Sequence, residues 1–507
     1  MRSVNAVKNL IVNFIYEVLV FGFGIIFPRY IILIYGSEIN GLTSTITRIL
    51  SLINLIQAGA VGAAIFQMYK PVAENDYDTQ SAIIYSSRKY YNRVTVIYLS
   101  IATVASVFYG LYLRNEKLAF IGIFLSFFIL SINGAGTLLF RSICDIYLSP
   151  VQKKYYLIIG MIAEQIVRYA FLSVVLILKL HYIFIYLSYV AGGIVAIIIN
   201  LYYFKKLSKD KIDNNPRNKN YIIPDKKYLM LQSVGGEAIT AAPTIIITTF
   251  IGLIQASVFS VYAMIYTSAK TLLSSIQLSL SPIFGNLVKT STEKHIYKIY
   301  DLIELMTILM GTILTAGSGF LLGPFIKLYT VGVNDANYYS ALLIIFVTIY
   351  SAIFTFKTSY GYVCTVYGLF RQTCFITVIF AIIGILISGI CTIIFGMPYV
   401  MAGLFMSEIG SAIAMLYVLK KRVSWFRLTN LFKRTVFLVI LSTVGLSLYF
   451  ILMPNINSWA HWFIFGLISI VVIFAVELIY CIVFERCQLC HLKLYARNII
   501  SKKTKTN

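Results

Sequence analysis

Ionisable residues lie inside several long apolar stretches of this 507-residue sequence. A charged side chain at the centre of a bilayer costs roughly 2.5–3.5 kcal/mol on insertion scales, so it normally faces a protein interior or a water-filled cavity. Cations in such a cavity can hold an anionic group, and carboxylates can carry a proton or an ion. The residues concerned are Glu17, Arg29, Arg48, Arg141, Asp145, Glu164, Arg168, Glu237, Lys270, Glu304, Lys357, Glu408 and Glu477.

Four of these cations form the predicted anion site, namely Arg29, Arg48, Lys270 and Lys357. Arg29 and Arg48 fall at similar depth on consecutive apolar stretches, about 8–9 Å below the outer boundary at ~1.5 Å per residue, where they could bracket one anionic group. Lys270 and Lys357 each lie in a stripe of polar and aromatic residues at helical spacing. Such stripes more often pack than bind, but a lysine within one favours a lined cavity. The polar and aromatic residues expected to line such a cavity are Tyr262, Tyr266, Gln277 and Tyr350.

The carboxylates have different predicted roles according to their positions in the apolar stretches. Glu17, Glu237 and Glu408 are candidates for proton or ion coupling, while for Glu17 a packing hydrogen bond to a neighbouring helix is the alternative. Residues four apart on a helix are neighbours, which predicts pairing within one helix. The pairs expected on this ground are Glu164 with Arg168 and Arg141 with Asp145, and Glu304 and Glu477, close to the ends of their stretches, are expected to be interfacial.

The elements that carry these residues are predicted membrane-spanning helices. The sequence is 59% hydrophobic and 12% charged, with a mean hydropathy of +0.84, which excludes a multidomain soluble enzyme and a disordered chain. A spanning helix needs about 20 mostly apolar residues. The expected fold is therefore an all-α polytopic membrane protein with fourteen spans, at 9–34, 42–68, 94–113, 118–147, 155–178, 182–204, 229–254, 256–284, 302–328, 339–367, 374–395, 399–419, 435–453 and 462–484.

Charged connections give the predicted domain organisation. The longest hydrophilic connection divides twelve of the helices into two groups of six. The expected parts are an N-terminal six-helix lobe (1–204), a basic linker (205–228), a C-terminal six-helix lobe (229–419), two additional helices (420–484) and a basic tail (485–507). With both termini in the cytoplasm, most Lys and Arg residues fall on the inner side, as the positive-inside rule requires.

Several function classes find no support in the sequence. The net charge of +23 is explained by this topology and by anionic lipid, so no nucleic-acid partner is expected. There is no phosphate-binding Gly-x-x-x-x-Gly-Lys-Ser/Thr run, and the four His lack metal-ligand spacing. We therefore expect neither cofactor nor metal, no catalytic residues, and a monomer as the default state.

The sequence resembles the Wzx-type flippases of O-antigen and capsule repeat units, in the multidrug/oligosaccharidyl-lipid/polysaccharide exporter (MOP) superfamily. The resemblance is strongest in the first ninety residues. It rests on the basic start 1–9 (MRSVNAVKN), Pro28 with Arg29, the run 36–42 (GSEINGL), Arg48, and the run 69–73 (YKPVA).

The resemblance implies a MATE/MOP-like fold and no enzymatic activity. It implies transfer of undecaprenyl-pyrophosphate-linked oligosaccharide to the outer leaflet of a bacterial cytoplasmic membrane, by two lobes alternating access around a cationic cavity. Arg29, Arg48, Lys270 and Lys357 would line that cavity, and the polar and aromatic lining residues Tyr262, Tyr266, Gln277 and Tyr350 would contact the sugars. Membrane lipids, a polysaccharide polymerase and chain-length machinery are the implied partners. The alternatives are a cation-coupled multidrug antiporter of the same superfamily and a membrane O-antigen polymerase or ligase.

Overall fold

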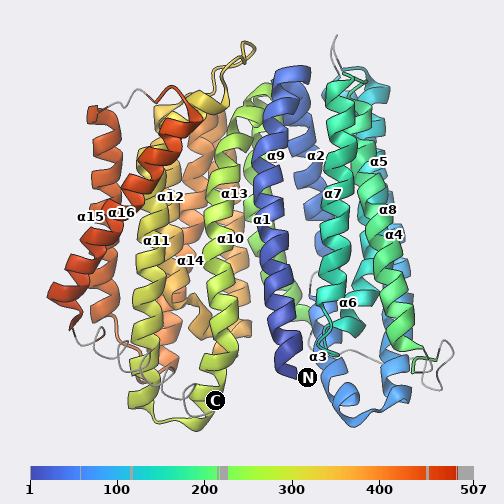
Figure 1. Cartoon of the computed structure of the whole chain (residues 1–507), viewed down its shortest axis with the longest axis horizontal. Helices are drawn as coiled ribbons and strands as arrows, with labels where there is room; N and C mark the ends of the chain where they lie inside the picture. Colours follow the sequence, from blue (N-terminus) through green and yellow to red (C-terminus); the bar gives the residue numbers. More distant parts are fainter. Residues whose placement is uncertain are drawn as a thin grey trace. The chain divides into compact units, whose positions relative to one another are not determined.

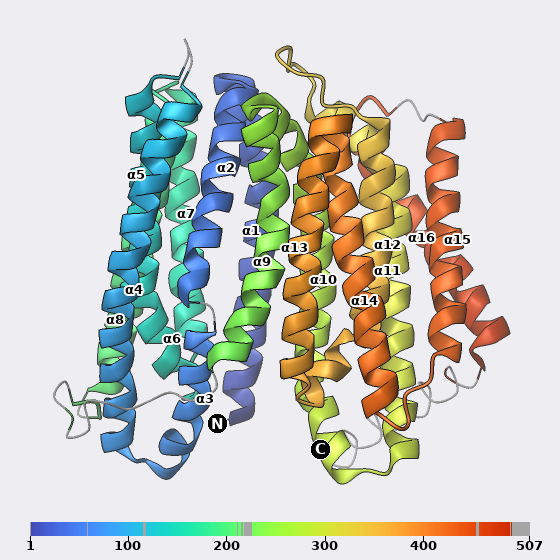
Figure 2. The ribbon, with the colours of Figure 1, turned by 180° about the vertical axis from the view of Figure 1, so that it is seen from behind.

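The computed structural model describes residues 2–57, 59–114, 118–209, 211–213, 216, 226–452, 456–486 and 488. Within these residues the secondary structure is helical. The chain divides into two compact units, each composed of long helices (Figures 1 and 2). Unit 1 comprises Met1–Ser260, Val333–Ala336 and Thr377–Ile382, and unit 2 comprises Val261–Gly332, Asn337–Ile376 and Ile383–Asn507.

Unit 1 has a core of buried aliphatic and aromatic side chains that runs through most of its helices. Two of these helices, α1 and α7, run parallel: Asn9 accepts a hydrogen bond from the Tyr155 N–H at one end, and the Tyr35 hydroxyl donates to the Leu180 carbonyl at the other. The helices are α1 (Arg2–Tyr35), α2 (Ser37–Ile53), α3 (Ala60–Glu74), α4 (Tyr77–Tyr112), α5 (Phe120–Gly136), α6 (Ser142–Leu148), α7 (Tyr155–Ile177), α8 (Ile183–Ser208) and α9 (Lys226–Phe250).

The predicted span 42–68 is not one helix. It begins earlier, at Ser37, because Asp335 caps α2: its carboxylate accepts hydrogen bonds from the Ser37 N–H at 2.6 Å and from the Ser37 hydroxyl at 2.8 Å. It then ends in a 3₁₀ turn at Asn54–Gln57, and Gly59 has a φ of 77° before α3 begins. A residue with a Cβ is strained at this φ, so the glycine marks a true interruption.

The predicted span 118–147 contains a different irregularity. A π-helical turn, Thr137–Arg141, joins α5 to α6. Such turns insert an extra residue into the helical ladder and frequently occur at functional sites. Here the turn carries Arg141, one of the charged residues embedded in this stretch.

Unit 2 is arranged around a largely buried helix, α11. This helix packs against α12, α15 and α16. A Cβ at Gly311 would lie 2.0 Å from a Thr355 side-chain atom, so the glycine permits α11 and α12 to approach closely. The helices are α10 (Leu253–Thr290), whose first residues belong to unit 1, α11 (Glu293–Tyr329), α12 (Ala341–Val366), α13 (Phe370–Phe395), α14 (Val400–Arg422), α15 (Thr429–Leu452) and α16 (Trp459–Phe484).

The prediction of a polytopic membrane protein is confirmed. Twelve helices in the described part of the chain are long and apolar enough to cross a membrane. The two predicted spans not among them, 229–254 and 256–284, correspond to α9 and α10. The lobe boundaries remain a prediction, and most of the tail and part of the linker 205–228 lie outside the described residues.

A fully buried arginine ties α15 and the end of α16 to α11. The Arg434 guanidinium lies 2.9 Å from Asp301, 2.9 Å from Glu304 and 2.8 Å from Glu485. Glu304, which the sequence analysis expected at the interface, is buried, as is Arg434. Glu477, also expected at the interface, is 3% exposed. The interfacial prediction is therefore wrong for both glutamates, because packing against neighbouring helices covers them.

We predict that Arg434→Gln lowers the free energy of unfolding by about 3–5 kcal/mol, since removing one partner leaves buried carboxylates uncompensated. The matched control is Lys433→Gln, which removes a charge from the adjacent exposed position. Thermal unfolding of the two purified variants is the measurement. Equal stability of both variants would show that the buried network contributes nothing to the docking of α15 and α16.

Candidate functional site

Two lysines from separate helices of unit 2 share one buried carboxylate. Lys357 on α12 lies 2.6 Å from Glu408 on α14, and Lys270 on α10 lies 3.8 Å from the other oxygen of the same group. Glu408 is 4% exposed. The structure thus unites two predicted anion-binding residues with a predicted coupling carboxylate.

Hydroxyl and aromatic groups complete this site. The Lys357 ammonium also donates a hydrogen bond to the Ser411 hydroxyl at 2.8 Å, and Tyr350 donates to Glu408 at 3.4 Å. The Lys270 ammonium lies 5.0 Å from the centre of the Phe354 ring. Tyr350, Phe354 and Lys357 are spaced by four and three residues, so α12 presents them on one face. A regular helix is therefore enough to position them.

The charge balance of the site is positive. Two ammonium groups and one carboxylate sum to a formal charge of +1 within one bundle of helices. Lys357 is about 24 Å from the start of α12 and about 14 Å from its end at 1.5 Å per residue, so its charge lies well inside the span. An excess cation at such depth favours an anionic ligand or water.

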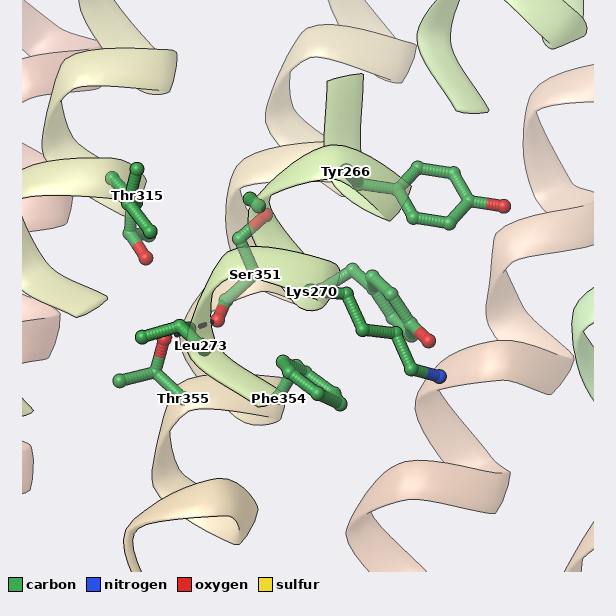
Figure 3. Close-up of a pocket in the computed structure, with 10 residues that line it drawn as sticks. Tyr266, Lys270, Leu273, Thr315, Ser351, Phe354 and Thr355 are labelled. Atoms are coloured by element: carbon green, nitrogen blue, oxygen red, sulfur yellow. Dashed lines mark hydrogen bonds between the residues drawn. The ribbon is translucent and has the colours of Figure 1, made fainter. Parts of the chain in front are cut away.

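A small cavity of about 10 Å³ adjoins Lys270, which is space for about one water molecule. Figure 3 shows Tyr266, Lys270 and Phe354 extending to one side, and Thr315, Ser351 and Thr355 lying on the other. Tyr266 and Tyr350 both line this cavity and meet edge to face at 5.1 Å. Their predicted role in contacting sugar remains a prediction.

Two other predicted lining residues make hydrogen bonds with backbone groups. Tyr262 is completely buried, and its hydroxyl donates to the Tyr338 carbonyl and accepts from the Ser340 N–H. Gln277 donates its side-chain amide to the Thr358 carbonyl. The Tyr262 hydroxyl is thus engaged at the start of α12, and the sugar contacts expected of Tyr262 and Gln277 remain predictions. The hydrogen bond of Gln277 links α10 to α12.

The other predicted cations and coupling carboxylates belong to unit 1. Arg29 on α1 and Arg48 on α2 are both half-buried, and Arg48 has no carboxylate partner among the described residues. Glu17 on α1 is half-buried, whereas Glu237 on α9 is exposed. The coupling roles of Glu17 and Glu237 remain predictions. Convergence of the four cations on one chamber remains a prediction.

The predicted pairs within single helices are wrong. Arg141 lies 3.7 Å from Glu164 on α7, and Asp145 lies 3.8 Å from Lys154. Arg168 instead lies over the rings of Tyr169 and Tyr189. Arg141 and Glu164 pair across two helical segments and not within one helix. Sequence spacing therefore did not reveal that Arg168 has no carboxylate partner within 4.0 Å among the described residues.

An apolar groove lies on the neighbouring face of the helices that carry Lys357 and Glu408. Its volume is about 230 Å³. The groove is bordered by α12, α14 and α15, and its walls are mainly aliphatic with several hydroxyls. The lining includes Ile349, Ala352, Phe356, Ile413 and Val439. Unit 2 therefore presents a charged site and an apolar groove on the same pair of helices.

Solved transporter structures share this fold. An inward-facing multidrug resistance MATE family transporter of the MOP superfamily matches with a TM-score of 0.66 at 11% identity, over 78% of this chain and 93% of that chain. The lipid II flippase MurJ in an inward closed conformation matches with a TM-score of 0.63 at 16% identity, over 94% and 98%. The eukaryotic MATE transporter AtDTX14 matches at 0.52 and 12% identity, over 83% and 98%.

The chain therefore has the fold that these MATE and MurJ structures share. No protein-family model matches the sequence, and the search of curated proteins finds no match.

We predict that Lys357 and Glu408 are energetically coupled. In a double-mutant cycle of Lys357→Met and Glu408→Gln, the coupling in the free energy of unfolding should be about 1–3 kcal/mol, because each single change leaves a buried charge without its closest partner. Denaturant unfolding of the purified proteins measures it. Lys420→Met, an exposed change on the same α14, is the control, and strictly additive effects would mean that the contact carries no energy.

Proposed function

We propose that the protein is a flippase for a polyprenyl-diphosphate-linked oligosaccharide, moving it from the cytoplasmic to the outer leaflet by alternating access. The observation that carries this proposal is the pair Lys270 and Lys357 sharing the single carboxylate of Glu408. Two cations balanced by one anion leave a charge that a diphosphate can neutralise. Charged headgroups cannot cross hydrocarbon unassisted, because they would lose their hydration.

The surroundings of the lysines suit such an amphiphilic substrate. The Ser411 hydroxyl lies 2.8 Å from the Lys357 ammonium, and a hydroxyl of this kind can exchange hydrogen bonds with sugars. The apolar groove along α12, α14 and α15 offers a lipid chain a place beside the charged site. MurJ, a lipid II flippase, has the same fold.

A multidrug antiporter is the competing function, since MATE transporters share the fold equally well. Such a pump for cationic drugs should offer an acidic cavity. Glu408 is a buried acid, but both of its oxygens face lysines, which opposes the binding of a cation. The charge balance therefore favours an anionic substrate.

The proposal is tested with purified protein in liposomes that contain a fluorescent polyprenyl-diphosphate disaccharide. Lys270→Gln and Lys357→Gln should each slow the movement of this lipid about tenfold or more, because each removes a charge-assisted contact. Fluorescence quenching from outside measures the movement, and Lys420→Gln is the control. Wild-type transport of a cationic dye but not of the lipid would establish the antiporter instead, and unchanged rates in both lysine variants would refute the cationic site.

The groove makes a separate prediction about the lipid chain. Ala352→Trp should fill the groove and slow transport of a long polyprenyl substrate about tenfold, while a short-chain analogue that leaves the groove empty moves at the wild-type rate. The physical reason is the loss of apolar contact area for the chain. Ala414→Trp adds the same side chain to α14 away from the groove lining and serves as the control. Equal slowing of both substrates would exclude the groove as a chain site.

A further inference from the structure

Arg168 on α7 is a cation of unit 1 that is surrounded by aromatic rings. Its guanidinium lies 3.4 Å from the centre of the Tyr189 ring on α8 and 4.7 Å from the centre of the Tyr169 ring. Among the described residues no carboxylate lies within 4.0 Å of it, and its buried Nε has no hydrogen-bond partner. The rings attract the charge, but they do not provide strong acceptors for its five N–H donors.

The acid expected to neutralise Arg168 is engaged elsewhere. Glu164 lies one turn earlier on α7, but its carboxylate faces Arg141 at 3.7 Å. Arg141 is carried by the π-helical turn. Glu164 and Arg141 therefore compensate each other, and the charge of Arg168 remains available.

Arg168 lies far from both ends of its helix. At 1.5 Å per residue it is about 20 Å from the start of α7 and about 14 Å from its end. An arginine at this depth needs acceptors for its donors, supplied by water or by an anion. The planar guanidinium matches the oxygens of a phosphate in a two-point contact, which a lysine cannot reproduce.

The packing around Arg168 fixes its position before any ligand arrives. A Cβ at Gly192 would lie 2.6 Å from the Glu164 carbonyl oxygen and 3.0 Å from the Arg168 Cβ, so α7 and α8 touch here. Tyr189 precedes this contact by one turn of α8, which places its ring on the guanidinium. On the other side, Tyr169 stacks on Phe27 of α1 at 4.4 Å. A site built in this way loses little freedom on binding.

We propose that Arg168, held by Tyr169 and Tyr189, binds a phosphate group within unit 1. The ligand class is a phosphate-bearing lipid headgroup, either an isoprenoid diphosphate or an anionic phospholipid of the bilayer. This site is additional to the lysines of unit 2 and does not depend on the identity of the transported substrate.

The test measures binding in a Lys270→Gln/Lys357→Gln background, so that unit 2 contributes little. One arm titrates farnesyl diphosphate onto the protein in phosphatidylcholine nanodiscs, and the other measures retention of phosphatidylglycerol by native mass spectrometry. Arg168→Gln should weaken binding about 10- to 100-fold in at least one arm, the loss expected for a charge-assisted two-point contact. Arg168→Lys should recover only part of it, and Tyr189→Phe, which keeps the ring, should bind like the background protein.

The control is Arg88→Gln, which removes an exposed arginine that also lies over a ring, that of Phe204 at 5.9 Å. If Arg168→Gln does not fold, Arg168→Lys alone tests the two-point contact. Loss confined to phosphatidylglycerol would support the site and assign it to bilayer lipid, and this result is separate from failure of the flippase proposal. Binding in both arms that is unchanged by Arg168→Gln, or absent from the background protein, would overturn the proposal.

Discussion

Two lysines compete for one buried carboxylate in unit 2, and the candidate function depends on this imbalance. Each ammonium group costs free energy inside a membrane span unless an anion or water compensates it. Glu408 serves both Lys270 and Lys357 and therefore cannot fully neutralise them. The contact brings α10, α12 and α14 to one point. A diphosphate can supply additional negative charge to the two lysines, which favours the binding of an anion. When the ligand leaves, the contacts of Glu408 with both lysines form again, which favours release.

The buried charges of this protein fall into two kinds. Around Arg434 one cation meets three carboxylates at 2.8–2.9 Å, and the side-chain amides of Asn430 and Gln488 donate to one of them, Asp301, at 2.9 and 2.8 Å. Such a closed network fits a structural joint between helices. Around Glu408 two lysines face one carboxylate among the described contacts, and Arg168 lies against aromatic rings with no carboxylate within 4.0 Å among the described residues. This difference in partners is the basis on which we propose binding at Glu408 and Arg168 and a structural role for Arg434.

Hydropathy predicts the helical architecture well, because a bilayer demands long apolar helices and each predicted span corresponds to a helical segment. It does not reveal the break at Gly59 or the π-helical turn at Thr137–Arg141, since both depend on local backbone geometry and tertiary contacts. Lys270, Lys357 and Glu408 were singled out from the sequence as candidate embedded charges, and their roles remain predictions. Spacing could not show that they meet, because periodicity identifies the face of a helix and not the helix opposite. The same limit explains the mistaken pairing of Glu164 with Arg168.

The most direct test of the central claim is the affinity of the protein for farnesyl diphosphate before and after Glu408→Gln. Removing the carboxylate frees both lysines, so the dissociation constant should fall about tenfold, whereas Glu237→Gln, which removes an exposed carboxylate, should leave it unchanged. Titration in phosphatidylcholine nanodiscs provides the measurement. An unchanged or weaker affinity in the Glu408→Gln protein would contradict the account, because Glu408 would then not be competing with an anionic ligand for the two lysines.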